Sequence, residues 1–138
     1  MAPPKPDPGV QAIAIRTGDD IVRVRQAVRG SAVEVGLSLV DQTKIVTAAS
    51  ELARNTLDYG GGGLATIEIV RDATRRGVRI RFEDAGPGIA DVELALKPGY
   101  TTGRGMGLGL GGARRLSSEF SIASEIGKGT RVVIARGK

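Results

Sequence analysis

The sequence predicts an α/β (α+β) two-layer sandwich, in which a mixed, mostly antiparallel sheet carries most of its helices on one face. Segments that alternate between apolar and polar residues, as strands do, occur near the N-terminus, in the middle and at the end of the chain. Two long segments with apolar residues at helical spacing lie between the first strand and the second. Short turns join the later strands in pairs, which favours antiparallel neighbours.

The length of the chain, 138 residues, suits a single domain with one core, and residues 10–138 are predicted to form it. Residues 1–9 contain four of the six prolines and are predicted to be a disordered tail. Aromatic residues make up only 3% of the chain, so Leu, Ile, Val and Ala must fill the core.

The composition excludes several classes of function. The chain has no cysteine and no histidine, which excludes disulfides, a Ser-His-Asp triad and the common zinc sites. No apolar run approaches the ~20 residues that cross a bilayer, so we expect a soluble cytoplasmic protein without a membrane partner. The net charge of +5 suits an anionic ligand, but only four aromatic residues argue against a nucleic-acid partner.

The first quarter of the chain is predicted to form a strand and a helix. Residues 10–16 alternate as a strand does. Asp19 or Asp20 is predicted to cap a helix that runs to about Val35, with Gly36 at its C-terminal end.

A second helix is predicted over residues 40–59 and ends at a run of four glycines. Glu51, Asn55 and Asp58 fall within a narrow arc beside its apolar stripe. The arc is either a solvated flank or a functional one, and the helical pattern alone does not decide between them.

The second half of the chain is predicted to contain four strands and two helices. The strands are predicted over residues 64–70, 78–83, 120–124 and 130–136. Between the second and third of these strands, a short helix is predicted over residues 90–96 and a longer one over residues 107–118. Residues 97–106 show no periodicity and are predicted to be a mobile flap. The arginines between 71 and 81 are interpreted as a solvated edge, face and turn of the sheet.

Two glycine-rich segments lie in this half: Asp84-Ala-Gly86-Pro-Gly88 after a strand, and residues 103–109 before a helix. Glycine lets a ligand approach the backbone closely, and unpaired N–H groups at a helix start attract an anion such as phosphate. The carboxylate of Asp84 can accept a hydrogen bond from the same ligand. The alternative is that 21 glycines simply mark a loop-rich domain.

Three well-known glycine-rich sites do not fit the sequence. The Walker pattern is absent, because the segment 127–130 lacks its spacing. Residues 107–112 match GxGxxG, but no strand precedes them directly. A eukaryotic-type kinase needs a histidine in its catalytic loop, and the chain has none.

Four motifs stand in the order of the boxes of the GHKL (Bergerat-fold) ATPases, and the chain resembles that superfamily over nearly its whole length beyond the tail. They are Glu51-Leu-Ala-Arg-Asn55, Asp84-x-Gly86-x-Gly88, Gly105-x-Gly107-x-Gly109-Leu110 and Gly127-x-Gly129-Thr130. Within the superfamily, the chain is most similar to the bacterial anti-sigma-factor serine kinases, and among them to the switch kinases of the stressosome.

The resemblance implies a role for each motif. Asn55 would bind Mg²⁺, Glu51 would act as the base toward the attacking hydroxyl, and Asp84 would accept from the amino group of adenine. Arg104 would either touch the γ-phosphate or be a solvated arginine of the flap. The remaining positions implied to contact ATP are Gly86, Gly88, Gly105, Gly107, Gly109, Leu110 and Thr130.

The resemblance also implies an activity and its partners. We expect an ATP-dependent protein serine/threonine kinase that phosphorylates a STAS-domain antagonist or scaffold protein and afterwards activates a partner phosphatase. The alternative is an anti-sigma factor that sequesters a sigma factor with ATP as a ligand. The presence of Glu51 favours the enzyme, because binding alone requires no base. Homodimer formation stays open.

Overall fold

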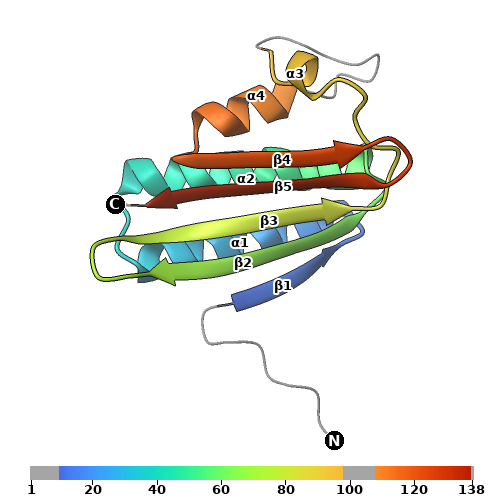
Figure 1. The fold of residues 1–138 in the computed structure, drawn as a ribbon. Helices are drawn as coiled ribbons and strands as arrows, with labels where there is room; N and C mark the ends of the chain where they lie inside the picture. Colours follow the sequence, from blue (N-terminus) through green and yellow to red (C-terminus); the bar gives the residue numbers. More distant parts are fainter. Residues whose placement is uncertain (1–9, 98–107, 138) are drawn as a thin grey trace, which may run out of the picture.

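The computed structural model describes residues 10–97 and 108–137, and Figure 1 shows their arrangement. The elements, in the predicted order, are β1 (Val10–Ile15), α1 (Gly18–Glu34), α2 (Leu39–Asp58), β2 (Gly63–Arg71), β3 (Arg76–Asp84), α3 (Val92–Ala95), α4 (Leu108–Arg115), β4 (Glu119–Glu125) and β5 (Gly129–Gly137). The predicted tail over residues 1–9 lies outside the described residues, as does the predicted flap except for Lys97.

The five strands form one sheet in the order β1-β2-β3-β5-β4, and each neighbouring pair is antiparallel. The predicted fold class is thus confirmed, but the described strands form a wholly antiparallel sheet where a mixed, mostly antiparallel one was predicted. The two consecutive helices explain the first pairing. α1 leads the chain away from the end of β1 and α2 returns it, so Gly63 begins β2 opposite Ile15.

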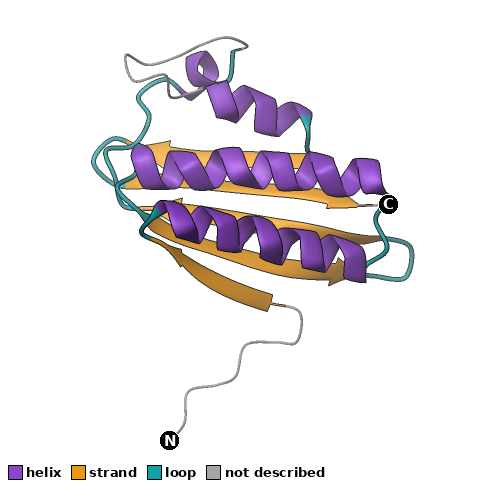
Figure 2. Cartoon of the chain, turned by 180° about the vertical axis from the view of Figure 1, so that it is seen from behind, coloured by secondary structure: helices purple, strands orange, loops and turns teal. Residues whose placement is uncertain are grey.

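α1 and α2 lie side by side over one face of the sheet, as Figure 2 shows. The strands turn apolar side chains toward them, and Ile67, Ile80 and Ile134 form one fully buried row across β2, β3 and β5. Full burial of a side chain of this size contributes about 1.5–3 kcal/mol. The helices contribute buried residues such as Val28 and Ile45 to the same core. One core therefore lies between the two layers.

The predicted cap of the first helix is wrong. Thr17 is the N-cap residue, and Asp20 occupies the third helical position, where its carboxylate accepts from the backbone N–H groups of Arg16 at 2.8 Å and Thr17 at 3.0 Å. An acidic residue in the third helical position accepts hydrogen bonds from backbone N–H groups that precede the helix. An N-cap residue accepts in the same way from the N–H groups of the first helical turn. The predicted C-terminal glycine is confirmed, because Gly36 has a φ of 79°.

The predicted end of the last helix is also wrong, because α4 ends at Arg115 and not at residue 118. The hydroxyl of Ser117 donates to the carbonyl oxygen of Ala113 at 2.6 Å. In a longer helix this carbonyl oxygen would accept from the backbone N–H of Ser117 instead. The backbone N–H of Ser118 then donates to Ala135 of β5 at 2.8 Å. Pairing with β5 thus begins before the helical pattern of the sequence ends.

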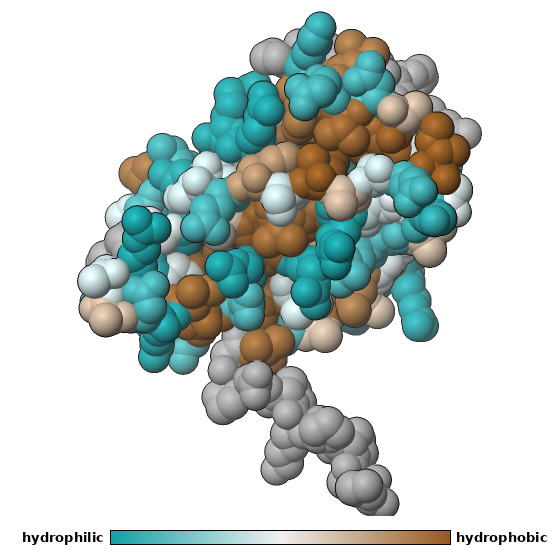
Figure 3. Space-filling model, in the orientation of Figure 1, coloured by the Kyte–Doolittle hydropathy of each residue, from teal (hydrophilic) through white to brown (hydrophobic). Residues whose placement is uncertain are grey.

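The other face of the sheet carries no helix among the described residues, and Figure 3 shows hydrophilic and hydrophobic residues mixed on it. Arg79 pairs with Glu68 at 3.1 Å, and Arg81 pairs with Glu83 at 2.8 Å, so part of the arginine cluster is balanced locally. None of the helices within residues 10–97 and 108–137 is long and apolar enough to cross a membrane.

Candidate functional site

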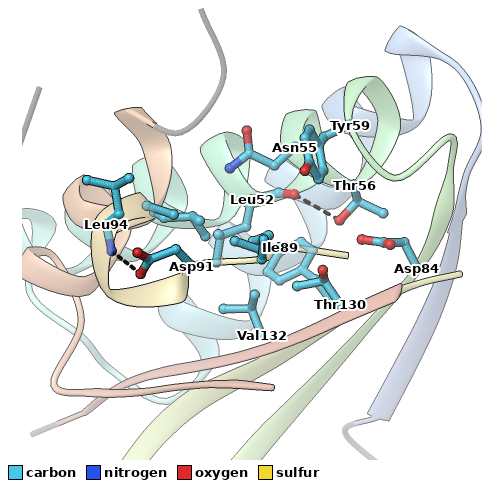
Figure 4. A pocket seen from close by; sticks show the side chains of 14 residues that line it. Leu52, Asn55, Thr56, Tyr59, Asp84, Ile89, Asp91, Leu94, Thr130 and Val132 are labelled. Carbon is cyan, nitrogen blue, oxygen red and sulfur yellow. Dashed lines mark hydrogen bonds between the residues drawn. The ribbon is translucent and has the colours of Figure 1, made fainter. Parts of the chain in front are cut away.

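A cavity of about 340 Å³ lies at one end of the molecule, between the C-terminal half of α2 and the segment that includes α3 and α4 (Figure 4). Its size falls in the range of small-molecule sites, which are mostly apolar with a few polar groups. The residues that line it are Leu52, Asn55, Thr56, Tyr59, Phe82, Asp84, Ile89, Ala90, Asp91, Leu94, Ala95, Leu110, Thr130 and Val132.

The strands give the cavity an apolar floor with one polar edge. Phe82 and Val132 are cross-strand neighbours in β3 and β5, and both are buried. Two residues further along, Asp84 lies opposite Thr130, and Thr130 lies opposite Ser124 of β4. Because side chains alternate between faces along a strand, this polar row faces the same side as the apolar row. A ligand with a flat apolar ring and polar groups along one edge could lie on these two rows.

Asp84 is half-buried at the end of β3, and burial raises the pKa of its carboxyl group above the ordinary value. The backbone N–H groups of Gly86 and Thr130 oppose this rise, and the Gly86 N–H lies 2.9 Å from Oδ1. A carboxylate in such surroundings gains from any additional donor that a ligand brings. Asp84 is therefore placed to accept a hydrogen bond from a ligand in the cavity.

The turn after β3 needs glycine at two positions. A Cβ atom on Gly86 would lie 2.7 Å from the Cα of Gly60, so the turn can approach the end of α2 only without a side chain. Gly88 has a φ of 77°, which favours glycine, and a Cβ there would overlap the carbonyl oxygen of Glu125. Both predicted glycines thus shape the turn beside the cavity.

Three elements hold this turn in place. The hydroxyl of Tyr59, the C-cap residue of α2, donates to the carbonyl oxygen of Gly88 at 2.9 Å. The hydroxyl of Ser124 in β4 accepts from the N–H of Ile89 at 2.7 Å. The N–H of Gly127, in the turn between β4 and β5, donates to Pro87 at 2.9 Å. The wall of the cavity is consequently attached to α2 and to both C-terminal strands.

α2 brings one of its two predicted site residues to the cavity. Asn55 lines the cavity, and its side-chain amide has no hydrogen bond to any described residue. Glu51, one turn earlier, is exposed, does not line the cavity and has no ion pair with the part of the chain that the structure describes. Asp58 is exposed and lies 3.7 Å from Arg54, as a solvated flank would.

The second glycine-rich segment is only partly visible. Leu110 of α4 is buried and lines the cavity, and Gly109 lies in the first turn of that helix. Arg104, Gly105 and Gly107 lie outside the described residues, so their predicted contacts stay predictions.

Two residues of the site were not predicted. Tyr59 lines the cavity and follows Asn55 by four residues, so the helical period of α2 places both on one face. Ser124 follows Phe120 and Ile122 at the spacing of inward-facing strand residues. Both periodicities are present in the sequence, but neither residue type by itself indicates a site.

The side chains that line the cavity supply only some of the oxygen ligands that a hard cation needs. No group of three or more acidic residues within residues 10–97 and 108–137 is arranged so that it could hold a metal ion. The side-chain amide oxygen of Asn55, which has no hydrogen bond to any described residue, is a ligand that Mg²⁺ accepts, provided that phosphates and waters fill the other positions of its octahedron. One such ligand among the described residues is compatible with a magnesium ion that arrives with a polyphosphate.

Two curated proteins resemble the chain along most of its length. The serine/threonine-protein kinase RsbT of Bacillus subtilis (strain 168) is 46% identical over 120 residues, which cover 87% of this chain and 90% of RsbT. The anti-sigma F factor of Clostridium acetobutylicum is 28% identical over 131 residues, which cover 90% of this chain and 88% of that factor.

Solved structures show the same fold. The structure of the RsbU and RsbW domains of Rv1364c from Mycobacterium tuberculosis superposes with a TM-score of 0.64 at 23% identity, covering 98% of this chain and 34% of that longer one. The catalytic domain of the histidine kinase ThkA superposes with a TM-score of 0.51 at 17% identity, covering 93% of this chain and 98% of that domain.

Residues 40–136 match the family profile described as histidine kinase-, DNA gyrase B- and HSP90-like ATPase. This range contains all four predicted motifs, the whole lining of the cavity and the turn after β3. The predicted superfamily is confirmed, and with it ATP as the ligand of the fold. The chain belongs to the histidine kinase-, DNA gyrase B- and HSP90-like ATPases.

Proposed function

We propose that this chain is an ATP-dependent protein serine/threonine kinase of a bacterial partner-switching pathway of the stressosome type. The observation that carries the proposal is the 46% identity to the serine/threonine-protein kinase RsbT over 90% of its length. Because the match spans 87% of this chain, it includes the helix that carries Glu51 and most of the cavity lining, so it concerns the site as well as the fold.

Adenine suits the cavity by shape and by hydrogen bonding. Phe82 and Val132 offer apolar surface to the faces of the ring. Asp84 would accept a hydrogen bond from the exocyclic amine of adenine. Guanine carries a carbonyl oxygen at that position, which a carboxylate repels, so ATP is preferred to GTP.

Asn55 would supply the protein ligand to Mg²⁺, and Gly105, Gly107 and Gly109 would lie against the phosphates. The bound cation neutralises charge on the phosphates during transfer. The position of Asn55 in the cavity lining, with no hydrogen bond from its side chain to any described residue, supports this assignment.

Glu51 would orient or deprotonate the hydroxyl of the protein substrate. Its exposed position one helical turn from Asn55 is open to a second protein, while Asn55 faces the nucleotide cavity. A base for a protein hydroxyl must be reachable from outside, whereas a nucleotide contact need not be.

The substrate that we propose is a STAS-domain antagonist or scaffold protein in the cytoplasm. Once released from it, the kinase would activate a partner phosphatase. The second candidate function, an anti-sigma factor that sequesters a sigma factor, is favoured by the 28% identity to the anti-sigma F factor. Glu51 distinguishes the two candidates, because sequestration needs no base.

Phosphoryl transfer to a purified STAS-domain protein tests the proposal directly. The chain is incubated with that protein and Mg-ATP, and phosphoserine and phosphothreonine are measured by mass spectrometry. The Glu51→Gln variant should bind ATP normally and transfer phosphate at least ~10²-fold more slowly. Glu34→Gln, the same change at an exposed position of α1, is the matched control and should leave the rate unchanged.

The results separate the two candidates. Transfer by the wild-type chain that is lost in Glu51→Gln supports the kinase. If the wild-type chain transfers no phosphate, and if both the wild-type chain and the Glu51→Gln variant bind a sigma factor in the presence of ATP, the anti-sigma-factor function replaces the kinase function. A transfer rate that Glu51→Gln does not change would remove Glu51 from the mechanism.

A further inference from the structure

Ser124 lies just outside the cavity, in the same cross-strand row as Asp84 and Thr130. Its hydroxyl oxygen is 2.8 Å from the hydroxyl oxygen of Thr130, which lines the cavity. The same oxygen accepts from the N–H of Ile89 at 2.7 Å. Ser124 therefore links a residue that lines the cavity floor to the turn that forms one cavity wall.

The Ser124 hydroxyl has a single proton, which it donates either to the carbonyl oxygen of Gly129 or to the hydroxyl of Thr130. In the first arrangement the Thr130 hydroxyl donates to Ser124. The carbonyl oxygen of Gly129 lies at 3.2 Å, and the hydroxyl oxygen of Thr130 lies nearer, at 2.8 Å. The 2.8 Å contact has the usual length of a hydroxyl hydrogen bond with either oxygen as the donor, so an acceptor on a ligand in the cavity selects the arrangement in which Ser124 donates to Thr130. With the Ser124 proton on Thr130, the Thr130 hydroxyl keeps its own proton free to donate into the cavity.

The free proton of Thr130 complements the ligand that we propose. The edge of adenine presents a donor, the amine at C6, beside an acceptor, the ring nitrogen N1. Asp84 supplies an acceptor and Thr130 a donor, side by side in the register of β3 and β5. Guanine presents the opposite pair on this edge, an oxygen at C6 and an N–H at position 1.

We infer that Ser124 is a positioning residue for base recognition, which directs the Thr130 hydroxyl so that the site reads N1 of adenine as well as the amine. The inference rests on the proposed ATP binding and adds a residue that lies outside the cavity lining. Ser124 acts through Thr130 and does not touch the nucleotide.

Calorimetric binding of three nucleotides distinguishes this role from a structural one. The probes are ATP, 1-deaza-ATP, which lacks the N1 acceptor, and 7-deaza-ATP, which keeps it. Ser124→Ala should weaken ATP and 7-deaza-ATP binding about three- to tenfold, the usual effect of one hydrogen bond. Its effect on 1-deaza-ATP should be less than about twofold. Ser124→Thr retains the hydroxyl on a strand and should bind ATP as the wild-type chain does.

A double-mutant cycle with Thr130→Val tests whether Ser124 acts through Thr130. The Val variant keeps the shape of Thr130 and removes its hydroxyl, so it should weaken ATP binding by itself. Adding Ser124→Ala should then cause little further loss, because contacting residues that act as a unit are not additive. Circular dichroism and thermal unfolding of each variant establish that it is folded.

Three results would overturn the inference: unchanged ATP binding in Ser124→Ala, equal weakening of all three nucleotides, or additive losses in the double variant. Equal weakening would mean that Ser124 only holds the turn through Ile89. A wild-type chain that binds no ATP would overturn the proposed function, and the inference with it. Normal wild-type binding with an unchanged Ser124→Ala variant would overturn the inference alone.

Discussion

The hydroxyl of Tyr59 donates a hydrogen bond of 2.9 Å to the carbonyl oxygen of Gly88, which joins the end of α2 to the turn after β3. Both partners belong to the cavity wall, since Tyr59 lines the cavity and Gly88 precedes the lining residue Ile89. α2 also carries Asn55, so a single helix with its C-cap residue positions the turn beside Asp84 and the side chain that we propose to bind Mg²⁺. The two parts of the site are thereby held at a fixed separation.

Tyr59→Phe should weaken ATP binding about two- to tenfold, because the ring still lines the cavity while the hydrogen bond to Gly88 is lost. The melting temperature of the nucleotide-free protein should change little, since the ring keeps its apolar contacts. Calorimetric titration with Mg-ATP measures the effect. Unchanged affinity would show that the turn keeps its position without α2.

Asp84→Asn should weaken ATP binding by about tenfold or more, because a neutral amide replaces a charged acceptor. The same change should raise the melting temperature of the nucleotide-free protein at pH 7. Burial raises the pKa of Asp84, so the folded state bears the cost of its negative charge. Thermal unfolding without nucleotide and calorimetry with nucleotide measure the two effects separately.

The stabilising effect of Asp84→Asn should depend on pH. A carboxyl group with a raised pKa binds its proton more tightly in the folded state than in the unfolded state. In the window between its ordinary value and its folded value, stability therefore falls as pH rises. The difference in melting temperature between the variant and the wild-type chain should be largest at neutral pH and shrink as pH falls through that window. A constant difference would mean that the charge of Asp84 is not its cause.

Asp20→Asn should lower the melting temperature at pH 7. The Asp20 carboxylate accepts from the backbone N–H of Arg16, which holds its pKa below the ordinary value. The stability that it contributes is present above the ordinary value and is lost as pH falls through the folded value. Asp19→Asn, an exposed neighbour in the same helical turn, is the control and should shift the melting temperature less. If the two variants lowered the melting temperature equally, the cause would be the negative charge near the helix start and not the hydrogen bonds of Asp20.

Gly88→Ala should destabilise the protein by at least about 1–2 kcal/mol, because its positive φ and the nearby Glu125 carbonyl leave no room for a side chain. Gly30→Ala should instead stabilise it by about 0.5–1 kcal/mol, since Gly30 lies inside α1 with open space around its Cβ position. Urea denaturation measures both changes. A tolerated Gly88→Ala would show that the turn can move away from β4.

Several site residues were predicted from the sequence because their signals are local. Asn55, Asp84, Leu110 and Thr130 line the cavity, and Gly86 and Gly88 shape its wall, while their contacts with ATP stay predictions. Each belongs to a short motif whose residue types have a direct chemical meaning. Tyr59 and Ser124 carry no such signal, because a tyrosine in a helix and a serine in a strand are usually ordinary surface or core residues. Their contacts arise only when the chain folds.

The sequence by itself determined the order of the strands and helices, the buried face of each and the positions that require glycine. Periodicity and backbone freedom are properties of a few consecutive residues, so they are readable without the fold. The tertiary structure decided which residues share the polar row at the cavity. Asp84, Thr130 and Ser124 meet because β5 pairs between β3 and β4 in one particular register. That register depends on apolar rows such as Ile80 with Ile134, which pair strands that are distant in the sequence and bury both side chains at once.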